Sequence, residues 1–263
     1  MDLIEAARRG VGTEAARHPW EPARIQVIKE LVRRHALLRD GAVVVDVGCG
    51  DGFVVEQLAS VYREALFYAV DTGFTEDVLV QLRGRFGSRR ILPLTSLGEV
   101  PRLPDGPASL ILLMDVIEHV PQDIEFLKSL SDQPFVGSST TFLITAPAYE
   151  ALSCSHDLFL GHYRRYSNVS LTRTVERAGL RVVDSGYFFL SLLAVRALQR
   201  LRERVFGIEP EEASSAIVTW RGDHRQSSIL ARLLELDARV SLALKSVRVR
   251  LPGLSNYMIC VKG

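Results

Sequence analysis

The chain has 263 residues, of which 47% are hydrophobic and 24% are charged, so it can bury one large core and is not a disordered chain. Its 32 basic and 31 acidic residues give a net charge of +1, and the basic residues are not interleaved with stacking aromatics. These features argue against a nucleic-acid-binding protein.

The first predicted element is a helix, because Ile25, Ile28, Leu31 and Val32 recur at helical spacing after residues 18–24. An apolar strand is predicted next, over residues 43–47.

The most informative motif follows this strand. Asp46 lies inside the strand, and Gly48, Gly50 and Gly52 come directly after it. Glycines at a strand-to-helix turn let the backbone approach a ligand, and the first N–H groups of the next helix bind polar groups. The spacing Gly-x-Gly-x-Gly differs from the dinucleotide pattern Gly-x-Gly-x-x-Gly. The segment therefore predicts a nucleotide-cofactor loop.

A second apolar strand, residues 66–70, ends at Asp71, and helical spacing from Phe53 onward completes a βαβ unit. In doubly wound sheets, an acidic residue about 20 positions after the glycines accepts hydrogen bonds from the ribose hydroxyls. We therefore predict that Asp71 binds a ribose.

The remaining elements follow in order. Helices are predicted over residues 76–86 and 171–178, and strands over 90–94, 108–115, 140–146, 181–187 and 256–261. The strand at 108–115 is almost continuously apolar, which is typical of a strand covered on both faces. Two apolar stripes predict two more helices, joined by a polar loop over 207–223. The stripes are Leu190, Leu193, Ala197, Leu201 and Val205, and Leu233, Leu236, Val240, Leu244 and Val247.

The glycine loop and the segment Asp115-Val116-Ile117-Glu118-His119-Val120 resemble the first and fourth motifs of class I S-adenosylmethionine-dependent methyltransferases of the small-molecule type (methyltransferase-11/12-like). The resemblance implies an α/β fold with a doubly wound, Rossmann-like seven-stranded sheet, an antiparallel last strand beside the sixth and a helical insertion before it. It also implies S-adenosylmethionine as the cofactor, with a leading helix over it. The cofactor-binding residues implied are Trp20, Arg24, Asp46, Gly48, Cys49, Gly50, Gly52, Asp71, Thr72, Ser96, Leu97, Met114 and Asp115.

The chain departs from this family after the third strand. Many members carry an Asp there that binds the adenine amino group, whereas this chain reads Thr95-Ser96-Leu97-Gly98-Glu99. The Ser96 hydroxyl or a backbone N–H near Leu97 is left to bind the adenine, and Cys49 is expected to serve only as a small residue.

A second segment rich in chemistry, residues 156–167, follows the fifth strand. Its His-Asp and Gly-His-Tyr-Arg-Arg-Tyr runs resemble the acceptor-side loop of a bacterial branch of these enzymes that acts on lipids, sugars or secondary metabolites. For a hydroxyl acceptor, His119 or His162 is the expected base, and His119 and the loop from His156 to Tyr166 should face the methyl group from opposite sides of one pocket. The substrate-binding residues expected are His156, Asp157, Tyr163, Arg165 and Tyr166.

An alternative interpretation of Glu118 and His119 is a polar helix start, with the acid near the positive end of the helix. The histidines and Asp157 are metal-ligand types, but no His-x-x-x-His pair and no Cys pair is present, so no metal site is predicted.

The expected organisation is a single methyltransferase domain over residues 1–263. It comprises a helical cover (1–40), a cofactor-binding core (41–186), a helical insertion (187–252) and a final strand (253–263). From Tyr187 onward, twelve basic and seven acidic residues give +5, and the rest carries −4. The insertion is expected to form a lid, a homodimer interface or a peripheral membrane contact. Its apolar run at 187–195 is too short to span a bilayer.

Cys49, Cys154 and Cys260 have no disulfide or metal spacing, and no secretory signal is visible, which together predict a cytoplasmic protein. Two alternatives to methyl transfer remain open. An NAD(P)-dependent reductase uses the same strand-loop-acid unit, although the glycine spacing differs and no Tyr-x-x-x-Lys pair follows the fourth strand. A cofactor-binding interaction protein without turnover would also need the loop.

Overall fold

The computed structural model describes residues 17–206, except 88 and 105, and residues 224–263. The start of the predicted cover, residues 1–16, and the predicted polar loop at 207–223 lie outside the described residues.

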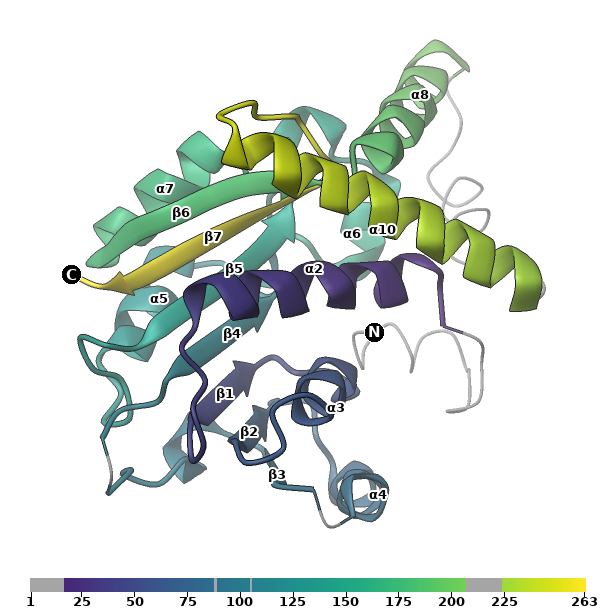
Figure 1. Cartoon of the computed structure of the whole chain (residues 1–263). Coiled ribbons are helices and arrows are strands. Elements are labelled where there is room, and N and C mark those ends of the chain that lie inside the picture. Colours follow the sequence, from purple (N-terminus) through teal and green to yellow (C-terminus); the bar gives the residue numbers. More distant parts are fainter. Residues whose placement is uncertain (1–16, 88, 105, 207–223) are drawn as a thin grey trace.

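A seven-stranded sheet forms the centre of the molecule (Figure 1). Its order is β3-β2-β1-β4-β5-β7-β6, with β7 antiparallel to both β5 and β6 and the other pairs parallel. The strands are β1 (Val43–Val47), β2 (Leu66–Val70), β3 (Ile91–Leu94), β4 (Leu110–Met114), β5 (Thr141–Pro147), β6 (Leu180–Phe188) and β7 (Ser255–Lys262). The predicted fold, including the antiparallel last strand, is confirmed.

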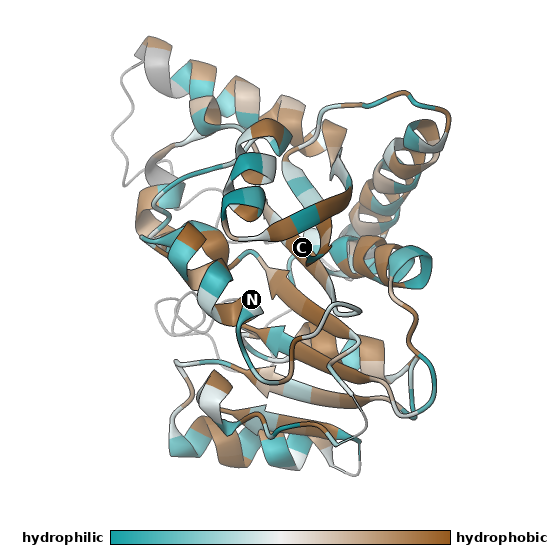
Figure 2. Cartoon of the chain, turned by 90° about the vertical axis from the view of Figure 1, so that its left-hand side faces the viewer, coloured by the Kyte–Doolittle hydropathy of each residue, from teal (hydrophilic) through white to brown (hydrophobic). Residues whose placement is uncertain are grey.

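Helices cover both faces of the sheet. One core lies under α2 (Trp20–His35), α3 (Phe53–Ala59), α4 (Glu76–Phe86) and α10 (His224–Ser246). The other lies under α5 (Asp123–Ser131) and α7 (Asn168–Arg177). The central strands β1, β2, β4 and β5 are buried on both sides and read as mainly apolar runs for that reason, as the brown strands of Figure 2 show.

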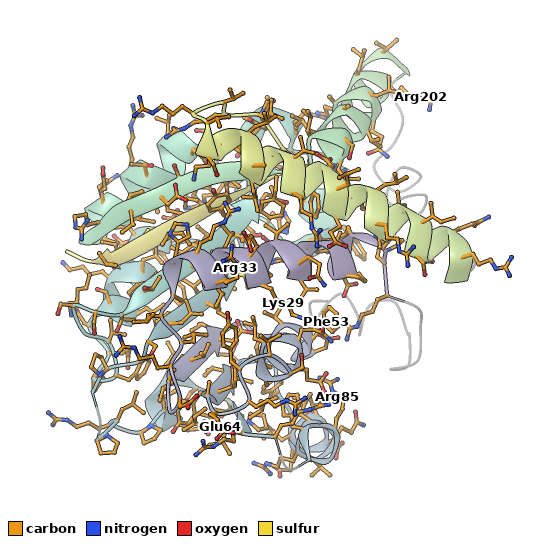
Figure 3. All side chains as sticks on the ribbon, in the orientation of Figure 1. Lys29, Arg33, Phe53, Glu64, Arg85 and Arg202 are labelled. Atoms are coloured by element: carbon orange, nitrogen blue, oxygen red, sulfur yellow. The ribbon has the colours of Figure 1, made fainter. Side chains whose placement is uncertain are left out.

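Local sequence signals fix several helix ends. Helix α4 begins where predicted, because the Thr75 hydroxyl accepts a hydrogen bond from the Val78 N–H. Helix α3 begins at Phe53, where the helical spacing was predicted to start, and stops at Ala59. Lys29 of α2 and Phe53 of α3 lie in the space between these helices (Figure 3), where Lys29 Nζ donates to Gln57 Oε1 at 3.2 Å.

The segment after β4 is not a continuous helix. The 3-10 helix η2 (Ile117–His119) precedes α5, and α6 (Ser155–Leu160) follows β5 and a further 3-10 turn, η3 (Glu150–Leu152). A third, η1 (Leu97–Glu99), follows β3. The interpretation of Glu118 as a polar helix start is therefore wrong: its side chain is fully buried.

Two helices, α8 (Leu190–Phe206) and α10, separate β6 from β7, as predicted. Helix α10 lies beside α2 on the sheet, while α8 projects from the body with Arg202 near its far end (Figures 1 and 3). The predicted apolar stripe of α10 is wrong by one residue: Leu233 is 58% exposed, whereas Leu234, with Ala238 and Leu242, is buried. None of the helices in the described part of the chain combines the length and apolar character that crossing a membrane requires.

Candidate functional site

The loop after β1 turns back onto the end of β2. Gly48, Gly50 and Gly52 have φ angles of +70°, +57° and +73°, a region that favours glycine. The Gly48 N–H donates to the Val70 carbonyl at 2.8 Å. A Cβ on Gly48 would lie 2.7 Å from Val116 Cγ2. Conformation and packing both require glycine at position 48.

Asp71, at the end of β2, is fixed beside this loop. Its Oδ2 accepts from the Gly50 N–H at 2.9 Å, and its Oδ1 accepts from the Gly73 N–H at 2.8 Å. Thr72 is exposed next to it. A carboxylate held by backbone donors at the carboxyl end of a central strand lies where ribose binding is predicted.

Asp46 lies in β1, at the base of the loop. It is 1% exposed, and neither carboxylate oxygen has a hydrogen-bond partner among the described residues. Burial raises the pKa of Asp46 to about 8, although Arg24 opposes the shift. Burial likewise raises the pKa of the Cys49 thiol well above its usual value. Cys49 is a free, buried cysteine and fits the expected role of a small residue.

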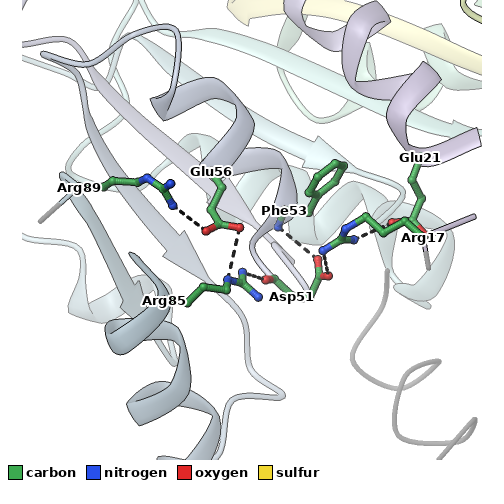
Figure 4. A network of polar contacts seen from close by, with 7 residues as sticks. All are labelled: Arg17, Glu21, Asp51, Phe53, Glu56, Arg85 and Arg89. Carbon is green, nitrogen blue, oxygen red and sulfur yellow. Dashed lines mark hydrogen bonds and ion pairs between the residues drawn. The ribbon is translucent and has the colours of Figure 1, made fainter. Parts of the chain in front are cut away.

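A charged network ties the segment before α2 to the glycine loop (Figure 4). The Arg17 guanidinium pairs with the carboxylates of Asp51 and Glu21 and lies 3.9 Å above the Phe53 ring. From the other side, Arg85 of α4 donates to the Asp51 carbonyl. The loop is therefore held from two sides, by the segment before α2 and by α4.

The segment after β3 contains an acidic residue that the sequence interpretation did not select. Glu99 Oε1 accepts hydrogen bonds from the hydroxyls of Thr95 and Ser96. Ser96 is exposed, and Leu97 is half-buried against the second core. Ser96 and the exposed Glu99 follow β3, the edge strand that pairs with β2, where the adenine is expected.

Arg24 joins the covering helix to the carboxyl ends of β4 and β5. Its Nη1 lies 2.9 Å from Asp115 Oδ2, and its Nη2 donates to Thr145 Oγ1 at 3.1 Å. The Thr145 hydroxyl donates in turn to Asp115 Oδ1 at 2.9 Å. Met114 is buried beside them, and Trp20 lies 5.3 Å from the Arg24 guanidinium. The predicted cover residues thus meet the fourth motif directly.

Glu118, His119 and His162 form a cluster just beyond β4. One potential ligand atom from each lies within 4.8 Å of the others, and the two imidazoles pack edge to face with centroids 4.7 Å apart. The prediction that His119 and the loop from His156 to Tyr166 face a pocket from opposite sides is wrong for His162, since its ring is in contact with that of His119. Glu118 is fully buried, and burial followed by the nearby Asp115 raises its pKa well above the usual value.

Asp157 anchors His162. Its Oδ1 lies 2.9 Å from His162 Nδ1 and accepts from Arg165 Nε at 2.7 Å, and its Oδ2 accepts from the Cys154 N–H at 3.0 Å. Burial opposes ionisation, but these hydrogen bonds and Arg165 hold the pKa of Asp157 well below its usual range. Asp157 and Arg165 were expected to bind substrate. Their side chains are almost fully buried against each other, so they hold His162 in place instead.

Tyr166 is also an internal residue rather than an acceptor contact. Its hydroxyl donates to Asp123 Oδ2 at 2.6 Å, and Arg164 pairs with the same carboxylate at 3.0 Å. Burial and Asp123 raise the pKa of Tyr166. Tyr163 is 59% exposed and open to a ligand. The side chain of His156 lies outside the described part of the chain.

Thr145 and Glu118 were not predicted as site residues. A signal for Thr145 existed, because it is a hydroxyl residue near the carboxyl end of an otherwise apolar strand. Glu118 belongs to the motif that led to His119, but its complete burial depends on the segment 162–166, which is remote in the sequence.

Comparisons with known proteins agree with this arrangement. A family model described as "Methyltransferase domain" matches residues 20–185, more than half of the chain. No curated protein matches. Among solved structures, coclaurine N-methyltransferase bound to N-methylheliamine and S-adenosylhomocysteine is 15% identical, with a TM-score of 0.56 over 96% of this chain and 74% of that one.

Two further structures share the fold. Phosphoethanolamine N-methyltransferase 2 of Haemonchus contortus, in complex with S-adenosylmethionine, is 15% identical with a TM-score of 0.53, covering 90% of this chain and 52% of that one. A Haloferax volcanii methyltransferase structure, solved with the Trm112 activator, is 13% identical with a TM-score of 0.56, covering 98% and 93%. At these identities the likeness shows the fold alone.

Proposed function

Since the chain belongs to the methyltransferase-domain family, we propose that it transfers a methyl group to a small-molecule or lipid-like acceptor. S-adenosylmethionine is the cofactor of this family, and when bound it supplies an electrophilic methyl group on a sulfonium. The observation that carries the proposal is the carboxylate of Asp71, fixed by the N–H groups of Gly50 and Gly73 beside a loop whose backbone conformation favours glycine.

The residues present fit this cofactor. Asp71 offers acceptor oxygens for ribose hydroxyls, and the unpartnered carboxyl of Asp46 lies beneath the loop, where a polar group of a ligand would satisfy it. Ser96 is exposed at the edge where the adenine is expected. We assign Trp20 and Arg24 to the covering wall, and Met114 and Asp115 to the boundary with the acceptor.

The acceptor side fits methyl transfer to a nucleophilic oxygen or nitrogen. His119 and His162 lie beyond β4 and β5, next to the Arg24–Asp115 pair at the end of the same strands. Methyl transfer requires the nucleophile to be held in line with the methyl group, and a hydroxyl must also lose its proton. We propose that the cluster of Glu118, His119 and His162 activates the acceptor, with the exposed Tyr163 lining its entrance.

Calorimetry tests the cofactor assignment. The protein should bind S-adenosylmethionine and S-adenosylhomocysteine but not NAD. Asp71→Ala should weaken binding of both about 10- to 100-fold, since two charge-assisted hydrogen bonds are lost at ~1.5–3 kcal/mol each before compensation by water. Asp77→Ala, an exposed change on α4, is the matched control. NAD binding without any signal from the other two ligands would reject the proposal.

For the insertion, we propose a role in assembly or acceptor access. Its exposed apolar residues on α10 repeat with helical spacing: Ile229, Leu233, Leu236 and Val240. Deleting α10 would also remove Leu234, Ala238 and Leu242 from the core, so point changes are the sharper test. The double variant Leu233→Asp/Leu236→Asp should lower the mass of the oligomer if the native chain oligomerises, or the fraction that floats with vesicles if it binds them. Its affinity for S-adenosylmethionine should stay unchanged. A large loss of that affinity in a folded variant would contradict it.

A further inference from the structure

The carboxylate of Glu118 is the least satisfied polar group near the acceptor side. It is 0% exposed, and neither oxygen has a hydrogen-bond partner among the described residues. A buried carboxyl group without a partner either keeps its proton or, when ionised, is paired with a cation or a metal ion. A cation held beside Glu118 would therefore stabilise its ionised form.

Two imidazoles surround this carboxylate. Ligand atoms of Glu118, His119 and His162 all lie within 4.8 Å of one another. Around zinc, ligand atoms at ~2.0–2.1 Å are ~3.3 Å apart in a tetrahedron. The ligand atoms of the cluster, which lie up to 4.8 Å apart, would have to move closer by about 1.5 Å to share one ion.

Residues outside the cluster also hold its ligand side chains in place. Histidines that bind metals almost always donate their other ring N–H to a carboxylate or carbonyl, which fixes the tautomer. His162 has this partner, since its Nδ1 lies 2.9 Å from Asp157 Oδ1, and this leaves Nε2 with a lone pair. Arg165 holds Asp157 from the far side. The Tyr163 N–H donates to the Glu118 carbonyl at 2.8 Å and ties the two ligand segments together.

We propose that Glu118, His119 and His162 bind one divalent transition-metal ion of the zinc type. Two imidazole nitrogens and one carboxylate favour such an ion over Mg²⁺ or Ca²⁺, which prefer oxygen ligands. Three protein ligands leave a coordination position open, as in catalytic rather than structural zinc sites. The spacing of histidines and cysteines in the sequence does not reveal this site, because η2 and the segment after α6 are brought together only by the fold.

This inference rests on the proposed function for its purpose. An acceptor hydroxyl bound at the open position would have a lowered pKa and lose its proton to solvent. Its oxygen then forms the bond to the methyl carbon while the bond from sulfur to that carbon breaks, and the electron pair stays on sulfur. The cluster would thus activate the acceptor without either histidine serving as the base.

Metal titration of the full chain tests the site. After treatment with a chelator, the protein should bind one Zn²⁺ per chain in equilibrium dialysis, and Co²⁺ should show the visible absorption of a tetrahedral site. Glu118→Gln, His119→Asn and His162→Asn should each weaken Zn²⁺ binding at least ~100-fold, and Asp157→Asn about 10- to 100-fold. His35→Asn, which removes a histidine on α2 away from the cluster, is the control and should retain full affinity.

Thermal unfolding of the metal-free variants checks that each is folded. Stoichiometric binding that the three ligand variants abolish supports the inference. No binding, or binding that none of the three changes, overturns it and leaves an imidazole base as the activating group. Calorimetry with S-adenosylmethionine on the metal-free protein separates the two proposals, since cofactor binding there should persist whether or not a metal binds.

Discussion

The two halves of the site are built differently. The cofactor half, at the ends of β1 and β2, is held by backbone groups that are close in the sequence: Asp71 accepts from Gly50 and Gly73. The acceptor half, at the ends of β4 and β5, is held by side chains that are far apart, such as Arg24 with Thr145. Backbone geometry makes the first half depend on few residue types, whereas the second half can change its chemistry by changing single side chains.

Each half also contains one unpaired carboxyl group. Asp46 in the cofactor half and Glu118 in the acceptor half are both fully buried and unpartnered among the described residues. Asp46 comes from a central strand, and Glu118 from a 3-10 turn packed against another loop. The following predictions test whether the two halves respond to substitution as differently as their construction suggests.

The largest effect is expected from the backbone-built half. Gly48→Val would force a β-branched residue to φ +70° and place its Cβ 2.7 Å from Val116 Cγ2. S-adenosylmethionine binding should fall at least ~100-fold, because the loop can no longer rest on β2. Gly41→Val is the matched control: φ is +77°, but nothing lies within 4 Å of its Cβ. Calorimetry should show retained affinity at Gly41, and equal losses would mean that strain alone is responsible.

In the acceptor half, two adjacent arginines offer a sharp contrast. Arg165→Met leaves the buried Asp157 without its main cation and should lower the free energy of unfolding by about 3–5 kcal/mol. Arg164→Met removes a partly exposed pair with Asp123 and should cost about 1 kcal/mol or less. Urea denaturation of both variants measures the difference. Similar losses would show that Asp157 finds another partner.

The sequence predicted the glycine turn after β1 and the acidic residue at the end of β2, because both are short-range patterns with a direct physical meaning. That these residues bind the cofactor stays a prediction. The family resemblance also implied the antiparallel last strand beside the sixth, and the two apolar stripes predicted the helical insertion before it. The sequence pattern assigned Asp157, Arg165 and Tyr166 to substrate binding, because sequence shows which side chains are near a strand end but not which ones point inward. The offset stripe of α10 has a similar cause: the helix has apolar residues on two faces, and only packing against α2 selects Leu234 over Leu233.

The next prediction concerns pH and Asp46. Its pKa is raised to about 8 in the folded chain, so between pH ~4 and 8 the folded state keeps a proton that the unfolded state has lost. Native stability should therefore fall with rising pH in that window, by up to ~1.4 kcal/mol per pH unit from this group. Asp46→Asn removes that dependence. In urea denaturation from pH 5 to 8, the free energy of unfolding of the variant should rise relative to that of the native chain at each pH step.

Glu30→Gln provides the control for this pH series. Hydrogen bonds from Arg33 are the main reason that the pKa of Glu30 is lowered to about 2, so the group is ionised in both states from pH 5 to 8. Its removal should shift the stability curve by a constant amount. Parallel curves for Asp46→Asn and the native chain would mean that Asp46 is paired when ionised.

Another small effect is expected where the covering helix meets the acceptor half. The Thr145 hydroxyl accepts from Arg24 and donates to Asp115, so it links the covering helix to the acceptor half. Thr145→Val keeps the shape of the side chain but removes both hydrogen bonds, while the direct Arg24–Asp115 pair at 2.9 Å remains. We expect a loss of about 1 kcal/mol in the free energy of unfolding. Thr145→Ser keeps the hydroxyl. In urea denaturation it should retain most of the free energy of unfolding that Thr145→Val loses, after allowance for the lost methyl group. If the serine variant is as destabilised as the valine variant, packing of that methyl group matters more than the hydrogen bonds, and the cover is held to the acceptor half by the Arg24–Asp115 pair alone.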